Sequence, residues 1–116
     1  MDGALESLTE ALRRFAAERD WSQFHSPKNL ACALAVESAE LLEHFQWLTD
    51  EQSEKLPAET RTAVGHELAD VLLYLLQIAD RLQIDLVAAA QQKLQLNAAK
   101  YPVAQARGNS RKYSEL

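Results

Sequence analysis

Two pairs of acidic residues, each pair three positions apart, are the residues of this chain best suited to chemistry. They are Glu37 and Glu40 in the segment ESAE, and Glu67 and Asp70 in the segment ELAD. Side chains at positions i and i+3 share one face of a helix. Four carboxylates gathered in a poorly hydrated cleft repel one another, and protonation or a cation relieves that repulsion. An all-oxygen ligand set favours a hard ion, and magnesium suits phosphate substrates because it keeps coordination positions open for them.

The hydrophobic pattern around these acids predicts that they point inward. Glu37 lies within the apolar seam of its segment, which consists of Leu30, Leu34 and Leu41. Glu67 and Asp70 flank the apolar residues Leu68 and Val71. A solvated charge would be expected on the opposite face of an amphipathic helix. Glu43 extends the first pair to ExxExxE and is expected to be solvated.

A magnesium ion held by these acids would neutralise a polyphosphate, orient it and activate a water molecule for attack on phosphorus. Glu40 and Glu67 are the candidates to accept the proton of that water, although either can serve as a ligand alone. A di-iron bundle is a competing interpretation of paired acids, and it requires Glu-x-x-His on a helix. His44 follows Glu40 by four residues, so that spacing is absent.

Four helices are expected to position these residues. Apolar residues recur at three- and four-residue spacing in each of them. Ser26 is the predicted N-cap of the second helix, with Pro27 as its first residue, and Asp85 is the predicted N-cap of the fourth. The predicted helices are Leu5 to about Glu18, Pro27 to about Trp47, Pro57 to about Leu82, and Leu86 to about Lys100. The apolar seam of the third is predicted to be Val64, Leu68, Val71, Leu75, Ile78 and Leu82, and Thr49 to Leu56 is predicted to be a loop.

These elements predict an all-α protein, a four-helix bundle with short connections. Residues 1–102 are expected to form one helical domain. Residues 103–116 form a basic tail, expected to be part of the same domain or an interface arm, and mobile unless a ligand or a neighbouring subunit holds it. Within the tail, Arg111 and Lys112 could clamp phosphate or contribute to such an interface.

The overall composition narrows the possible partners and compartments. The 116 residues carry a formal net charge of −5, which argues against binding to nucleic acid polymers. No apolar run approaches the length of a membrane span, and the N-terminus lacks the apolar core of a signal peptide. The single cysteine, Cys32, is predicted to be a buried thiol and fits a reducing compartment, so we expect a cytoplasmic protein. A domain of this size has a modest core, which oligomerisation would support.

Several longer stretches resemble one known family. The paired acids are similar to the ExxE and ExxD motifs of the MazG-like, all-α nucleoside triphosphate pyrophosphatases. Nearly the whole chain resembles the dCTP pyrophosphatase branch of that superfamily. The matching stretches are FAAERDWSQFHSPKNL, ELLEHFQWLTD, ELADVLLYL and ARGNSRKYSEL.

The resemblance implies hydrolysis of a nucleoside triphosphate between its α and β phosphates, with magnesium bound by the four acids. It implies that Trp21 and Trp47 enclose the base, and that four further residues lie near the nucleotide: His25, Tyr74, Lys93 and Asn97. It also implies a homotetramer built as two dimers. The substrate that the resemblance implies is dCTP or a modified dCTP. The branch can carry a histidine on its first helix where this chain has Leu12, so the preferred base stays open.

Two other functions are compatible with the residues. The tryptophans can be core or interface residues, and Lys93 and Asn97 can be ordinary exposed residues. A non-catalytic helical oligomeric interaction module would then need no activity. A nucleotide-binding regulator would bind triphosphates without releasing pyrophosphate.

Overall fold

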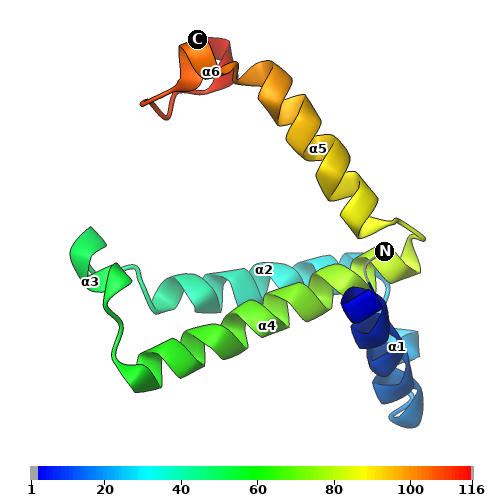
Figure 1. Cartoon of the computed structure of the whole chain (residues 1–116). Coiled ribbons are helices and arrows are strands. Elements are labelled where there is room, and N and C mark those ends of the chain that lie inside the picture. Colours follow the sequence, from blue (N-terminus) through cyan, green and yellow to red (C-terminus); the bar gives the residue numbers. More distant parts are fainter. Residues whose placement is uncertain (1–2, 116) are drawn as a thin grey trace. The chain divides into compact units, whose positions relative to one another are not determined.

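The computed structural model describes residues 3–115, and these are built from helices (Figure 1). Six α-helices and two short 3₁₀ helices occur in this range, and no residue in it forms a strand. The prediction of an all-α protein is confirmed. The chain divides into two compact units between Ile84 and Asp85, and each unit is described by itself.

The first unit holds three long helices, one short helix and one 3₁₀ turn. They are α1 (Gly3–Glu18), η1 (Ser22–Phe24), α2 (Pro27–Glu43), α3 (Asp50–Glu54) and α4 (Ala58–Arg81). The second unit contains α5 (Leu86–Lys100), α6 (Val103–Ala106) and η2 (Tyr113–Glu115). The four-helix bundle stays a prediction, because the fourth predicted helix, α5, belongs to the second unit.

The start of α2 follows the predicted capping pattern. Ser26 is in an extended conformation, and its hydroxyl oxygen accepts a hydrogen bond of 3.1 Å from the backbone N–H of Asn29. Pro27 occupies the first turn, where its missing N–H would have had no helical partner. Asp85 caps α5 in the same way, by accepting from the backbone N–H of Ala88. Both predicted N-caps are confirmed.

Replacing Ser26 by alanine is expected to lower the free energy of unfolding by about 1 kcal/mol, because one backbone N–H at the start of α2 loses its partner. The measurement is urea denaturation followed by circular dichroism. Ser38→Ala is the matched control, since Ser38 is exposed in the middle of the same helix. Equal destabilisation by the two variants would contradict the role of the cap.

The end of α1 determines where the backbone of Trp21 lies. Asp20 has a φ of 52°, in the left-handed region. The N–H of Asp20 donates to Ala17 O, and the N–H of Trp21 donates to Ala16 O at 2.9 Å. This pair of bonds is the Schellman pattern of helix termination. It ties the start of η1 directly to the last turn of α1.

Two predicted boundaries between α2 and α4 are wrong. The helix α2 ends at Glu43, because the following residues form tighter turns in which Phe45 N–H donates to Leu42 O. The predicted loop contains the helix α3, which begins with a capping box between Thr49 and Gln52. That T-x-x-Q pattern was the signal for a helix start.

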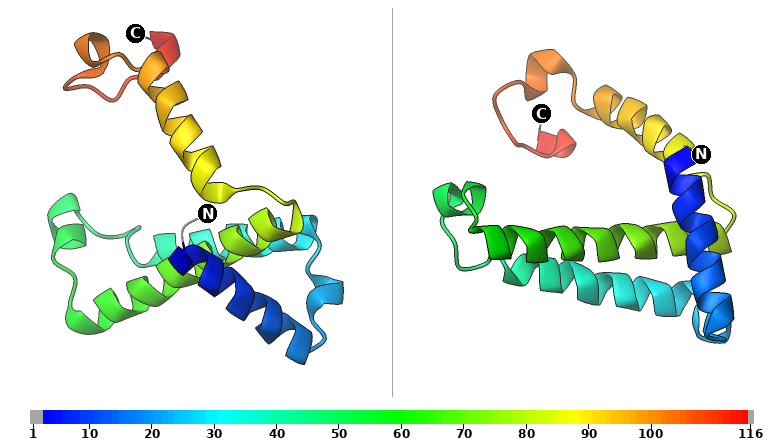
Figure 2. Two further views of the ribbon diagram at one scale, coloured as in Figure 1. Left: turned by 45° about the vertical axis from the view of Figure 1, so that its right-hand side comes forward. Right: turned by 60° about the horizontal axis from the view of Figure 1, so that its bottom comes forward.

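The helix α4 packs against both α2 and α1 (Figure 2). The two most buried large side chains are Leu30 of α2 and Leu76 of α4, each 1% exposed. Burying a leucine side chain stabilises a fold by about 1.5–3 kcal/mol. The remaining core residues of the first unit are Thr9, Ala16, Val64 and Ala79.

The predicted apolar seam of α4 is wrong at three of its six positions. Leu68, Leu75 and Leu82 are 54%, 38% and 51% exposed, whereas Leu76 and Ala79 are buried. The seam followed the most regular leucine spacing of the segment. The faces of α4 that pack on α2 and α1 instead include Leu76, Ala79 and the half-buried acids Glu67 and Asp70. The spacing of apolar residues alone does not show which face of a helix packs against its neighbours.

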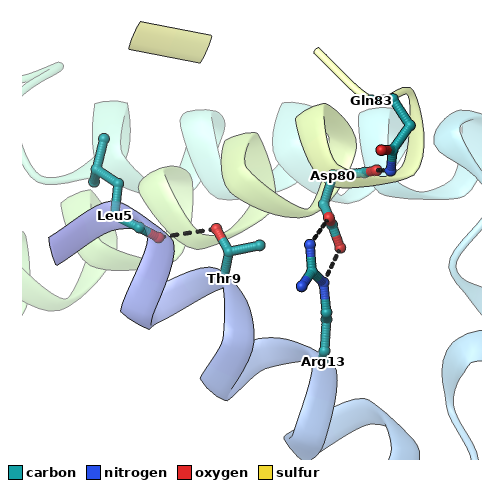
Figure 3. A network of polar contacts seen from close by, with 5 residues as sticks. All are labelled: Leu5, Thr9, Arg13, Asp80 and Gln83. Atoms are coloured by element: carbon teal, nitrogen blue, oxygen red, sulfur yellow. Dashed lines mark hydrogen bonds and ion pairs between the residues drawn. The ribbon is translucent and has the colours of Figure 1, made fainter. Parts of the chain in front are cut away.

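A polar contact joins α1 to α4 at the edge of this packing (Figure 3). The Arg13 guanidinium forms two hydrogen bonds with the Asp80 carboxylate, one of them 2.9 Å from Nε to Oδ2. The hydrogen bond from Arg13 holds the pKa of Asp80 below its usual value. One turn earlier on α1, the buried Thr9 hydroxyl donates to Leu5 O at 2.9 Å. The contact between Arg13 and Asp80 therefore links α1 to α4.

Among residues 3–115, no helix combines the length and the apolar character needed to cross a membrane.

The thiol of Cys32 is exposed, so the prediction that it is buried is wrong. Cys32 lies on α2 two residues after the buried Leu30, and a shift of two residues turns a side chain to another face of a helix.

Candidate metal centre and adjoining pocket

Three of the four predicted acids meet where α2 and α4 lie side by side. Glu37 comes from α2, and Glu67 and Asp70 come from α4. One carboxylate oxygen of each lies within 4.8 Å of the others, and all three residues are half-buried. Glu37 Oε2 and Glu67 Oε2 are buried without a hydrogen-bond partner in the described residues. Three converging carboxylates, two of them with an unpartnered buried oxygen, fit the coordination of a hard divalent cation.

The electrostatics of Glu37 agree with this arrangement. Burial, followed by the neighbouring Glu40, raises the pKa of Glu37 from its ordinary value to about 7. Asp70 and Glu67 act in the same direction. Burial and the charge of Glu37 also raise the pKa of the Tyr74 hydroxyl. The cluster thus has an excess of negative charge that a proton or a cation would relieve.

Glu40 and His44 lie at the edge of this cluster. Glu40 is half-buried and outside the group of three, but its carboxylate is near enough to raise the pKa of Glu37. His44 Nε2 lies 4.0 Å from Glu67 Oε1. The sequence suggested no role for His44 beside Glu67, because the two residues are on different segments and only the packing of the chain joins them. Glu43 is exposed, as predicted.

A pocket of about 420 Å³ adjoins the carboxylates. Glu37 and Asp70 of the cluster line it, together with Tyr74. Trp21 and His25 also line it; the Trp21 ring contacts Phe15 edge-on at 5.7 Å and His25 at 6.4 Å between centroids. The remaining lining residues are Leu8, Ala11, Leu12, Phe15, Ala16, Leu73 and Gln77. Its volume lies within the range of about 300–1,000 Å³ for small-molecule sites.

The other predicted site residues lie outside this pocket or in the second unit. Trp47 is 86% exposed, in the turn after α2, and does not line the pocket. Lys93 and the half-buried Asn97 are on α5. Arg111 and Lys112 are exposed, just before η2. A role for these five residues in binding a nucleotide stays a prediction.

The pocket also contains residues that sequence reasoning assigned to no site. The apolar spacing of this segment predicts a helix and no site, yet Leu8 and Phe15 of α1 are 39% and 46% exposed and line the pocket with Leu12. Gln77 lines the pocket from α4. Its position seven residues after Asp70, on the same helix face, was a signal that could have identified it.

A model of the MazG-like family matches residues 32–116, a segment that includes all four acids and Tyr74. The chain belongs to the MazG-like family. It is 46% identical to human dCTP pyrophosphatase 1 over 114 residues, which are 97% of this chain and 67% of the human protein. The mouse dCTP pyrophosphatase 1 is 44% identical over the same shares of the two chains.

A solved structure of a pyrophosphatase from Archaeoglobus fulgidus has the same fold as this member of the MazG-like family. The two chains superpose with a TM-score of 0.81 and are 38% identical. The match covers 88% of this chain and 95% of the other. The all-α architecture is therefore that of an experimentally determined MazG-like pyrophosphatase fold.

Proposed function

We propose that this protein is a magnesium-dependent nucleoside triphosphate pyrophosphohydrolase that converts dCTP, or a modified dCTP, to the monophosphate and pyrophosphate. One observation carries the proposal: three carboxylates converge, two of them with an unpartnered buried oxygen, and Glu37 and Asp70 of this cluster line a largely apolar pocket. A nucleoside triphosphate needs both: the carboxylates would hold the magnesium that binds its phosphates, and the apolar pocket would take its base. The homology to proteins named dCTP pyrophosphatase 1 supports the choice of substrate.

Glu37, Glu40, Glu67 and Asp70 would hold the magnesium. When bound, magnesium neutralises phosphate charge and lowers the pKa of a water molecule, which are the two contributions this hydrolysis needs most. The chain lacks a glycine-rich phosphate loop, since Gly3, Gly65 and Gly108 are isolated. Side chains must therefore provide the remaining contacts to phosphate.

In the proposed reaction a water oxygen bonds to the α-phosphorus, and the bond from that phosphorus to the bridging oxygen of the β-phosphate breaks. Pyrophosphate leaves with the bridging oxygen, and the proton of the water passes to a carboxylate. Glu40 or Glu67 is the proposed acceptor. Glu67 supports this choice because one of its oxygens is buried without a partner and the other lies 4.0 Å from His44 Nε2, a group that could take the proton onward.

The base is proposed to enter the apolar pocket, next to the Trp21 ring. An aromatic side chain stacked on a base contributes about 1–3 kcal/mol in nucleic-acid binders. The edge contacts of Trp21 with Phe15 and His25 hold its ring at the pocket wall. Tyr74, one turn after Asp70, lines the pocket and is proposed to contact the sugar or a phosphate. Trp47, Lys93, Asn97, Arg111 and Lys112 are proposed to complete the nucleotide site.

Self-association is part of the proposal. Leu68, Leu75 and Leu82 form an exposed apolar stripe on α4, and Val36 and Leu42 are exposed on α2. Exposed apolar patches on helices are typical of interfaces. A homotetramer built as two dimers would cover such faces and enlarge a modest core.

The test is to incubate the protein with each deoxynucleoside and ribonucleoside triphosphate, with and without magnesium, and to measure pyrophosphate and monophosphate. We expect release that depends on magnesium and is fastest with dCTP or a modified dCTP. Release of orthophosphate in place of pyrophosphate would contradict the position of cleavage. Nucleotide binding without release would favour a regulator, and neither binding nor release would favour an interaction module.

A further inference from the structure

Three pocket residues of α4 follow one another along a single helix face. Asp70, Tyr74 and Gln77 are spaced four and three residues apart, and all three line the pocket. With a rise of 1.5 Å per residue, Gln77 lies about 10 Å along the helix axis from Asp70. A nucleotide with its phosphates at the carboxylates therefore extends its sugar past Tyr74 and its base toward Gln77.

The walls around Gln77 offer few polar groups. The helix α1 contributes only apolar side chains to this pocket, among them Leu8, Leu12 and Phe15. The acids and Tyr74 are polar, and Trp21 is amphipathic. The other polar side chains that line the pocket are His25 and Gln77. A small number of polar groups in an apolar pocket determines the orientation and identity of a ligand. Gln77 and His25 are thus the two candidates to distinguish one base from another.

The amide of Gln77 has a defined orientation. Its Nε2 donates a hydrogen bond of 3.3 Å to the backbone oxygen of Leu73, one turn earlier on α4. This bond holds the amide nitrogen against the helix, and the amide oxygen points away from that contact because the group is planar. The side chain is half-buried, which limits competition from water. The bond uses one of the two N–H donors of the amide, and the oxygen is the acceptor that the amide offers to a ligand.

We propose that Gln77 is a specificity-determining residue, whose amide oxygen accepts a hydrogen bond from the exocyclic amino group of the base. This inference rests on the proposed function. Cytosine has an amino group at position 4 of its ring, where uracil and thymine have a carbonyl oxygen. A carbonyl oxygen facing the Gln77 oxygen would leave two acceptors without a donor in a partly buried site, which is unfavourable. Gln77 thus favours dCTP over dUTP.

The experiment compares kcat/KM for dCTP and dUTP in the wild type and in Gln77→Met, a substitution of similar length and helix propensity. The wild type is expected to prefer dCTP. Gln77→Met is expected to lower kcat/KM for dCTP about tenfold, the equivalent of one hydrogen bond, and to change kcat/KM for dUTP less than about twofold. Gln91→Met, at an exposed glutamine of α5, is the matched control and should keep the wild-type ratio.

Two further measurements separate specificity from folding and from catalysis. Gln77→Glu keeps an acceptor oxygen, so its ratio of dCTP to dUTP hydrolysis is expected to stay near that of the wild type even if both rates fall. Calorimetric titration with dCMP and dUMP should reproduce the loss of preference in Gln77→Met without any turnover. A wild-type ratio in Gln77→Met would overturn the role of Gln77 while leaving the proposed function intact. Absence of hydrolysis by the wild type would overturn both.

Discussion

Replacing Asp70 by asparagine, or Glu67 by glutamine, is expected to reduce the release of pyrophosphate from dCTP by at least about 100-fold. Each substitution removes one of three charges that converge within 4.8 Å, while it keeps the size of the side chain. The loss should appear mainly in kcat, because the charge is needed most as the phosphate bond breaks. Both rates are measured by a coupled pyrophosphate assay at saturating magnesium.

Glu43→Gln is the matched control for these two variants. Glu43 continues the spacing of Glu37 and Glu40 along α2, but its side chain is exposed and outside the cluster. Its activity should stay within about twofold of the wild type. If pyrophosphate release survives in Asp70→Asn and Glu67→Gln, the assignment of the metal centre is wrong. Equal losses in all three variants would point to a general effect of charge.

Magnesium is expected to raise the melting temperature of the wild type by about 10 °C at a concentration of 100 times its dissociation constant. Binding at that concentration adds about 2.7 kcal/mol, and for a chain of this size each kcal/mol shifts the melting temperature by about 4 °C. The physical source of the effect is the cluster of carboxylates with unpartnered oxygens, which destabilises the metal-free fold. Differential scanning calorimetry with and without magnesium measures it.

The pH dependence of the metal-free protein has a defined sign. The folded protein raises the pKa of Glu37 from its ordinary value to about 7, so it binds this proton more tightly than the unfolded chain does. The contribution of Glu37 to stability is therefore fully present below about pH 4.5 and is lost as the pH rises to about 7. Magnesium competes with the same proton, so its effect should be larger at pH 8 than at pH 6.

Glu37→Gln isolates this contribution. The variant should melt higher than the metal-free wild type at pH 8, because a neutral amide replaces a poorly solvated charge. It should also lose most of the response to magnesium, whereas Glu43→Gln keeps it. A Glu37→Gln variant with the full magnesium response would show that the ion binds elsewhere.

The elements of this fold were predictable because their signals are local. Ser26 with Pro27, and Asp85 before Leu86, are cap patterns that act within one turn, and both occur as predicted. The capping box at Thr49 was equally local, and its omission explains the missed α3. The seam of α4 was not predictable in the same way. Its leucines recur regularly, yet Leu76 and Ala79 are the residues that face the core.

By itself, the sequence determined the helical character of the chain, the pairing of Glu37 with Glu40 and of Glu67 with Asp70, and the family, because these depend on residue types and on spacing within one helix. Only the tertiary structure decided which acids converge, that His44 lies beside Glu67, and that the apolar face of α1 lines a pocket. Those facts depend on how helices distant in the sequence are oriented against one another. That orientation follows from the packing of Leu30 and Leu76 and from the contact between Arg13 and Asp80, which no periodicity within one segment specifies.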